Sequence, residues 1–179
     1  PLYSSAASDV YKRQGKTTLT RKLATKLGLL YQHLGPLPES WVEQDYISLG
    51  SHRCAYDRYH VSEIAYSWGV PGRVCKIKNA RFLHAALTVR FAAITVMITA
   101  DSDLLTLRHR DEDQMFDLQS VIRVNEMYCK LAPHYADVYY HATAARPFVP
   151  EHIEDEIVTK WQQRQICHSE WTATLKSSR

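Results

Sequence analysis

The strongest constraint on the fold is an uninterrupted apolar and β-branched run in the middle of the chain, residues 92–99 (AAITVMIT). A strand with one face in water alternates apolar and polar residues, whereas this run has no charged residue and no such alternation. Both of its faces must therefore be covered. Short apolar segments and segments of helical periodicity alternate on either side of it. The sequence thus predicts an α/β fold with a parallel sheet and helices on both faces.

The remaining elements follow from periodicity and from turn residues. The first helix is expected over residues 15–28, where Leu19, Leu23 and Leu27 recur every four residues and Gly28 ends the pattern. Further helices are expected over 38–50, 73–90, 117–131 and 150–166, with short helical segments at 60–68 and from Asp101, and further strands at 29–34, 53–56 and 138–143. A single domain is expected to cover residues 15–167, and the polar residues 168–179 are expected to form a frayed tail.

The first fourteen residues (PLYSSAASDVYKRQ) do not look like the start of such a domain. They offer no buried strand, and they resemble translated adapter sequence. We therefore expect residues 1–14 to be a non-native segment and the first strand of the sheet to be missing. A natural disordered tail is the alternative.

Composition excludes several classes of protein. The chain has 179 residues, 45% of them hydrophobic and 23% charged, and a net charge of +3, which is ordinary for one globular domain and requires neither nucleic acid nor membrane as a partner. Its four cysteines are scattered without metal-type spacing, which favours free thiols in a reducing cytoplasm. The longest apolar run is too short to cross a bilayer.

Residues Gly15, Lys16, Thr17 and Thr18 open the first predicted helix and match the end of the phosphate-binding pattern GxxxxGK[ST]. Glycine lets the backbone amides face the phosphates, and the amino terminus of the helix adds the positive end of its dipole. The lysine reaches the β- and γ-phosphates, and the first threonine hydroxyl coordinates Mg²⁺. The pattern predicts that these four residues bind ATP and that Thr17 binds Mg²⁺, as in a P-loop NTPase fold.

One position departs from this pattern. Its first glycine would stand at position 10, where this chain has Val10. The alternative for Lys16 is a solvated lysine at the start of a helix.

Asp57 and Arg58 follow the predicted strand at 53–56. Ligands of open parallel sheets bind at the carboxyl ends of the strands. A carboxylate there can accept a sugar hydroxyl or help to hold Mg²⁺, and a guanidinium can bind phosphate oxygens through two hydrogen bonds. We therefore expect Asp57 and Arg58 in the site, with a surface ion pair as the alternative.

A basic segment follows the central strand, residues 100–117 (ADSDLLTLRHRDEDQMFD). During phosphoryl transfer, arginines delivered by a closing loop neutralise the charge on the moving group and exclude water. Arg108 and Arg110 are the candidates, and His109 between them is expected to be a bystander. A solvated helix end is the alternative.

These motifs together resemble the thymidylate kinase family and the related phage-type deoxynucleoside monophosphate kinases, over about residues 15–166. The resemblance rests on GKTT at the first helix and on Asp57-Arg58-Tyr59 as a DR[YF] motif. It rests also on the segment at 100–117, which resembles the basic lid of that family. It implies that Asp57 and Arg58 bind the acceptor nucleotide and that Tyr59 supports its pocket. A looser match implies that Arg73 binds the acceptor phosphate.

The resemblance implies an enzyme that transfers the γ-phosphoryl of ATP to a nucleoside monophosphate, with dTMP as the first candidate and Mg²⁺ as the metal. Lys16, Arg58, Arg108 and Arg110 are the expected catalytic residues, and Thr17 and Asp57 the expected metal ligands. The alternatives are a nucleoside kinase, another small-molecule P-loop kinase, or an inactive truncated fragment. A small-molecule nucleotide is the expected partner, and a homodimer is an open possibility.

Overall fold

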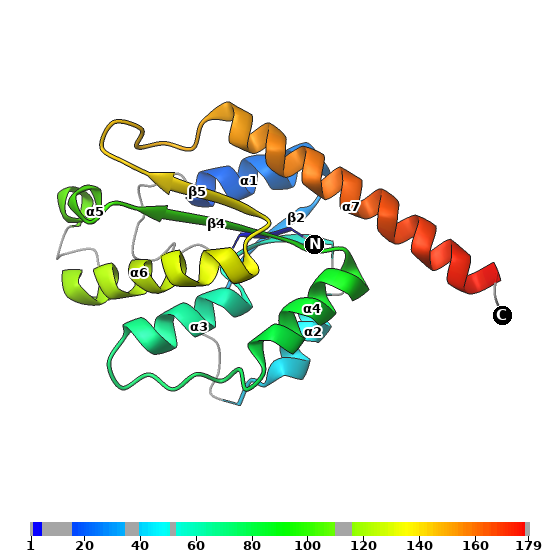
Figure 1. The fold of residues 1–179 in the computed structure, drawn as a ribbon, viewed down its shortest axis with the longest axis horizontal. Helices are drawn as coiled ribbons and strands as arrows, with labels where there is room; N and C mark the ends of the chain where they lie inside the picture. The colour runs from blue at the N-terminus through cyan, green and yellow to red at the C-terminus, as the bar shows by residue number, and fades with distance from the viewer. Residues whose placement is uncertain (1, 5–15, 35–39, 51–52, 110–115, 178–179) are drawn as a thin grey trace.

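The computed structural model describes residues 2–4, 16–34, 40–50, 53–109 and 116–177 (Figure 1). Its strands are β1 (Leu2–Ser4), β2 (Leu30–His33), β3 (Cys54–Asp57), β4 (Ile94–Ala100) and β5 (Val138–Ala142). They form one sheet in the order β2-β3-β1-β4-β5, and every neighbouring pair is parallel. Strand β4 is buried along its whole length. The predicted α/β architecture is therefore confirmed, with the run at 92–99 supplying an inner strand.

The expectation that the first strand is missing is wrong. Leu2–Ser4 lies at the centre of the sheet, paired with β3 on one side and β4 on the other. Three residues are too few to carry a readable hydrophobic pattern, so the position of this strand is set by pairing with distant parts of the chain. That residues 1–14 are non-native stays a prediction.

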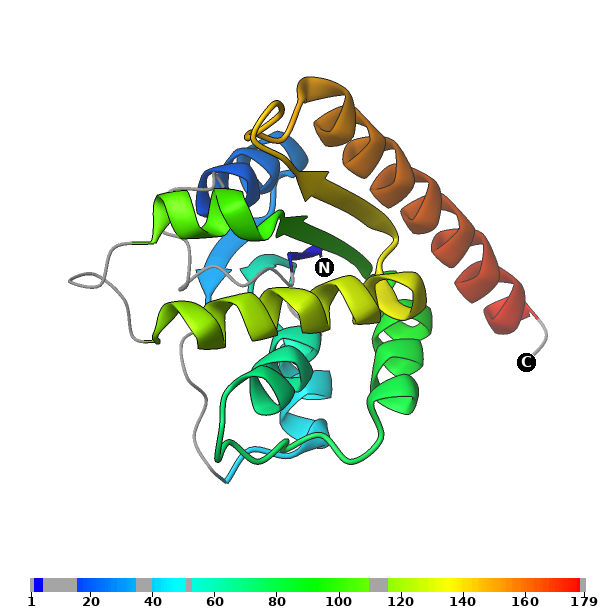
Figure 2. The same cartoon turned by 60° about the vertical axis from the view of Figure 1, so that its left-hand side comes forward.

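Helices cover both faces of the sheet. The helices are α1 (Lys16–Leu27), α2 (Glu43–Gly50), α3 (His60–Gly69), α4 (Ala80–Phe91), α5 (Ser102–Arg108), α6 (Leu118–Tyr135) and α7 (Glu151–Ser177). Helices α1 and α7 lie on one face, and α6, α3, α4 and α2 lie on the other (Figures 1 and 2). In the described part of the chain, no helix is both long and apolar enough to cross a membrane.

Two helices begin later than the sequence suggests. Helix α4 starts at Ala80 rather than 73, because Asn79 caps it by accepting the Phe82 N–H at 3.0 Å. The Glu43 carboxylate accepts the Asn79 N–H at 3.1 Å and also the Lys78 N–H, which holds the preceding segment outside the helix. Helix α2 starts at Glu43 rather than 38.

The C-terminal tail is helical rather than frayed. Helix α7 continues for 27 residues to Ser177 and extends beyond the sheet (Figure 1). Residues 168–177 (HSEWTATLKS) contain neither glycine nor proline, so nothing in them ends the helix. The Thr172 hydroxyl donates to the His168 carbonyl at 3.0 Å, one turn back along the same helix.

Helix α6 fixes the carboxyl end of the central strand. The Asn125 amide accepts the Ala100 N–H at 3.0 Å and donates to the Ala100 carbonyl at 2.9 Å. Asn125 is buried, so these bonds are shielded from water, and they satisfy both backbone groups of Ala100, beyond the last residue of β4 that pairs with β1. The edge of the sheet where ligands of such folds bind is therefore held in place.

Candidate active site

The amino terminus of α1 and the carboxyl end of β3 meet at one edge of the sheet. The Thr17 hydroxyl, in the first turn of α1, donates to Asp57 Oδ2 at 2.8 Å. Asp57 is the last residue of β3 and has no exposed surface. The structure thus joins the two predicted metal ligands, which are forty residues apart in the sequence.

Asp57 also contacts two side chains of β2, of which the sequence did not single out His33. The Tyr31 hydroxyl lies 3.4 Å and His33 Nδ1 lies 3.3 Å from the same oxygen, Oδ2. His33 stands directly opposite Asp57 in the parallel pairing, so the carboxyl end of the neighbouring strand was the signal for it. Burial, with the Asp57 carboxylate as the next cause, raises the pKa of Tyr31. Asp57 Oδ1 is buried and has no hydrogen-bond partner among the described residues.

Arg58 has an unusual backbone conformation. Its φ of 72° lies in the left-handed region, which costs a residue other than glycine about 1–2 kcal/mol. The side chain is buried, and burial lowers the pKa of its guanidinium, although an arginine stays charged at any physiological pH. Strained residues persist where the surrounding structure holds them, often at functional sites. The left-handed conformation at Arg58 turns the chain away from the direction of β3 directly after Asp57.

Tyr59 forms part of the wall beside this edge. Its hydroxyl donates to the Tyr46 carbonyl, and its ring meets the Tyr46 ring edge-on at 5.5 Å. Tyr59 is 2% exposed, so it contacts neighbouring side chains rather than solvent. These contacts are to Tyr46 of α2, and the support of an acceptor pocket by Tyr59 stays a prediction.

Arg73 lies in the segment between α3 and α4 and reaches back toward α3. Its Nη2 donates to Glu63 Oε2 at 2.7 Å. The guanidinium carbons of Arg58 and Arg73 lie 5.3 Å and 5.5 Å from the centre of the Tyr66 ring. The structure therefore brings the two arginines expected at the acceptor phosphate to the ring of Tyr66, and adds Glu63, which the sequence did not identify.

Arg108 lies at the end of α5 against the segment that joins β5 to α7. Its Nη2 donates to the Pro147 carbonyl at 3.3 Å, and its guanidinium carbon lies 5.5 Å from the centre of the Phe148 ring. Its Nη1 is buried without a hydrogen-bond partner in the described part of the chain. The catalytic role of Arg108 stays a prediction.

Several predicted site residues cannot be compared with the structure. Gly15, Arg110 and the side chain of Lys16 lie outside the described residues. Thr18 follows Thr17 in α1 and is exposed.

A second polar network joins the ends of β4 and β5. Asp101 Oδ1 lies 2.8 Å from His141 Nε2, and His141 Nδ1 lies 2.7 Å from the Thr99 hydroxyl. This order of acid, imidazole and hydroxyl is found in nucleophilic catalysis. However, Thr99 is 1% exposed and also bonds the Tyr139 hydroxyl at 2.8 Å, so its oxygen cannot meet a substrate. We assign the network to structure.

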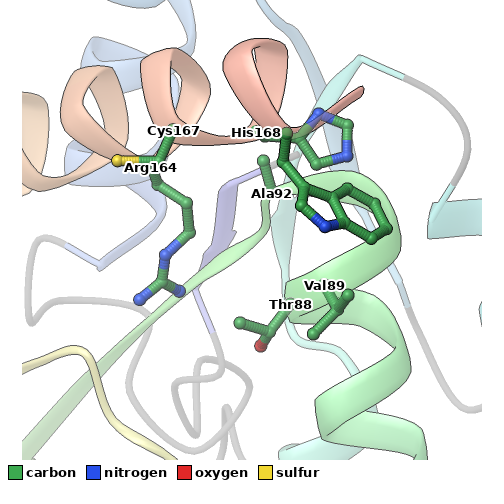
Figure 3. Close-up of a pocket in the computed structure, with 7 residues that line it drawn as sticks. Thr88, Val89, Ala92, Arg164, Cys167 and His168 are labelled. Atoms are coloured by element: carbon green, nitrogen blue, oxygen red, sulfur yellow. The ribbon is translucent and has the colours of Figure 1, made fainter. Parts of the chain in front are cut away.

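A groove at the opposite end of the molecule contains none of the predicted site residues. It lies between α4 and the second half of α7 and has a volume of about 280 Å³ (Figure 3). Its lining is mostly apolar and consists of Thr88, Val89, Ala92, Arg164, Cys167, His168 and Trp171. The convergent polar groups that chemistry needs are at the other edge of the sheet.

Comparison with known proteins gives a match in structure only. No family model and no curated protein matches the chain. The YorR protein of Bacillus subtilis, solved in complex with phosphorylated GDP, matches 88% of this chain and 93% of its own, with a TM-score of 0.67 and 15% sequence identity. The sheet is parallel throughout, α1 begins at Lys16 of the GK[ST] motif, and Thr17 in its first turn bonds Asp57 at the end of β3. The chain has the P-loop NTPase fold.

At this level of identity the likeness to YorR establishes the fold alone. Shikimate kinase from Bacteroides thetaiotaomicron aligns over 93% of this chain and 96% of its own at 16% identity, but its TM-score of 0.35 is too low to support any argument. The P-loop NTPase fold places the donor phosphates at the start of α1. The activity has to be argued from the side chains around that point.

Proposed function

We propose that this protein is a kinase that transfers the γ-phosphoryl of ATP to a nucleoside monophosphate, with dTMP as the first acceptor to test. The observation that carries the proposal is the 2.8 Å bond between Thr17, at the phosphate end of α1, and Asp57, the residue before Arg58. It sets the donor motif and the acceptor motif side by side. Phosphoryl transfer depends mainly on such positioning, together with electrostatic stabilisation.

The residues at this point fit Mg²⁺. Two neighbouring ligands of an octahedral Mg²⁺ are about 2.9 Å apart, which follows from its metal–oxygen distances. Thr17 Oγ1 and Asp57 Oδ2 are 2.8 Å apart, and Asp57 Oδ1 is a buried oxygen that lacks a partner among the described residues. Thr17 and Asp57 would hold the ion, and the ion would neutralise charge on the donor phosphates.

The side chains divide into a donor group and an acceptor group. Lys16 would bind the β- and γ-phosphates, with the amides that start α1. Arg58 and Arg73 would bind the acceptor phosphate through charge-assisted hydrogen bonds. Arg108 and Arg110 would neutralise charge on the phosphoryl group in transfer.

The proposal is tested by label transfer from [γ-³²P]ATP with Mg²⁺ to a panel of nucleoside monophosphates and nucleosides. The original protein is assayed in parallel with Val10→Gly, which supplies the first glycine of the GxxxxGK[ST] pattern. We expect labelled diphosphate from at least one monophosphate, with Val10→Gly more active. Because the lysine would stabilise charge on the β- and γ-phosphates during transfer, Lys16→Ala should lower kcat by at least about 100-fold.

The matched control is Lys22→Ala, on the same helix. Lys22 bonds Glu154 on α7 at 2.6 Å and lies away from the phosphate end, so its loss should leave turnover unchanged. Transfer of label to a nucleoside, with none to any monophosphate, would identify a nucleoside kinase instead. No transfer to any acceptor by either version would overturn the proposal.

A further inference from the structure

Helix α3 carries Glu63, which bonds Arg73, and Tyr66, whose ring lies near both acceptor-side arginines. Glu63 and Tyr66 lie about one helical turn apart, so they share a face of the helix. Arg58 precedes the helix and Arg73 follows it, yet each guanidinium lies within 5.5 Å of the same Tyr66 ring. Arginines at this range are attracted to the negative face of an aromatic ring. The Tyr66 ring therefore makes cation–π contacts with both arginines.

Glu63 fixes the second of these arginines. Its side chain is 3% exposed, and its Oε2 accepts from Arg73 Nη2 at 2.7 Å. A guanidinium has five N–H donors, and the Arg73 side chain is 26% exposed. The bond to Glu63 thus orients Arg73 while leaving part of it accessible to a ligand.

The same cluster holds buried oxygen atoms that the described residues do not satisfy. Glu63 Oε1 and the Tyr66 hydroxyl are both buried without a hydrogen-bond partner in the described part of the chain. Leaving such atoms unpaired costs about 1–3 kcal/mol each, and most buried polar atoms in proteins are paired. A folded protein that retains them on one helical face next to two arginines has the features of a binding site rather than of a core.

We infer that Glu63 is a positioning residue, which holds Arg73 against Tyr66 so that Arg73 and Arg58 together bind the phosphate monoester of the acceptor. The inference rests on the proposed function and gives Glu63 a part in binding the phosphate of its acceptor. Without the Glu63 carboxylate, Arg73 would keep its charge but would lose its fixed direction. Arg58 would then bind the phosphate alone.

The experiment is an NMR titration of the protein with inorganic phosphate, in which the side-chain Nε–H signals of Arg58 and Arg73 are followed separately. Phosphate bound at the phosphate loop does not obscure the result, because each signal reports its own arginine. Both signals should shift together with a single dissociation constant. Glu63→Gln keeps the shape of the side chain but removes its charge, and it should weaken phosphate binding roughly tenfold or more.

The matched control is Glu154→Gln. Glu154 is also a buried glutamate in an ion pair, but its partner is Lys22 and the pair lies on the opposite face of the sheet. This variant should leave both arginine signals and the dissociation constant unchanged. The inference is overturned if Arg73 does not respond to phosphate, or if Glu63→Gln binds phosphate as tightly as the original chain does.

The titration separates this inference from the proposed function. If the Arg58 and Arg73 signals shift together but the protein phosphorylates no acceptor, the phosphate-binding role of the two arginines is supported and the proposed kinase activity is refuted. Turnover of a monophosphate with an unchanged acceptor KM in Glu63→Gln would do the opposite.

Discussion

At the scale of single residues, His60 and His84 predict a dependence of stability on pH. His60 Nε2 lies 3.1 Å from His84 Nδ1, and burial, followed by the effect of His84, holds the pKa of His60 well below its usual value. Burial also lowers the pKa of His84. Both imidazoles therefore take up protons on unfolding. The contribution of this pair to the free energy of unfolding should be constant above about pH 6.5 and fall below it, by at most about 1.4 kcal/mol per pH unit for each histidine.

The measurement is urea unfolding between pH 7.5 and pH 5, compared with the double variant His60→Gln, His84→Gln. The readout is the slope with pH rather than the stability itself, which this double substitution can also change. The slope between pH 6.5 and pH 5 should be smaller in the variant. Equal slopes in the two proteins would show that the pair does not titrate on unfolding.

At the scale of elements, the position of α3 depends on its close approach to α6. A Cβ added to Gly69, at the end of α3, would lie 2.5 Å from Val124 Cγ2 and 2.7 Å from the Val124 backbone. Neither helix can relieve this contact by a change of rotamer alone. Gly69→Ala should therefore lower the free energy of unfolding by about 1–3 kcal/mol, and weaken acceptor binding by moving Glu63 and Tyr66. Trp68→Ala, at the neighbouring position with a 70% exposed side chain, should cost less than Gly69→Ala. Equal losses would contradict this account of the packing.

At the scale of the whole molecule, the strand order brings the two halves of the site together. Strand β1 lies between β3 and β4, and its last residue, Ser4, pairs with Asp57 at the end of β3. The order of the strands in the sheet differs from their order in the chain at this point, and ligands of open α/β sheets bind where such a change occurs. The groove shown in Figure 3 is lined by residues 88–92 and 164–171 and contains none of the residues around Asp57. The arrangement concentrates the expected chemistry at one edge of the sheet.

Local patterns account for what the sequence predicted correctly. The apolar run at 92–99 and the four-residue spacing of leucines before Gly28 each identify their element without help from the rest of the chain. Asp57 and Arg58 could be placed at a strand end for the same reason. The late start of α4 could not be predicted, because the Glu43 carboxylate that holds Lys78 and Asn79 outside the helix comes from α2.

The same distinction applies to the site. His33 contacts Asp57 only through the register of two parallel strands, and Glu63 meets Arg73 only after the segment between α3 and α4 turns back. Neither contact leaves a periodic signal in the sequence. Non-local contacts of this kind decide which side chains meet, whereas local patterns decide which elements carry them.

The central claim is that the acceptor carries a phosphate, and one comparison tests it most directly. The measurement is kcat/KM with ATP and Mg²⁺ for dTMP and for thymidine, which differ only in that phosphate, using the Val10→Gly protein, and then for the other monophosphate and nucleoside pairs. The account predicts that the monophosphate of at least one pair is used at least about 100-fold more efficiently, and that Arg58→Ala removes most of this preference. Equal or better use of the nucleoside in every pair would contradict it.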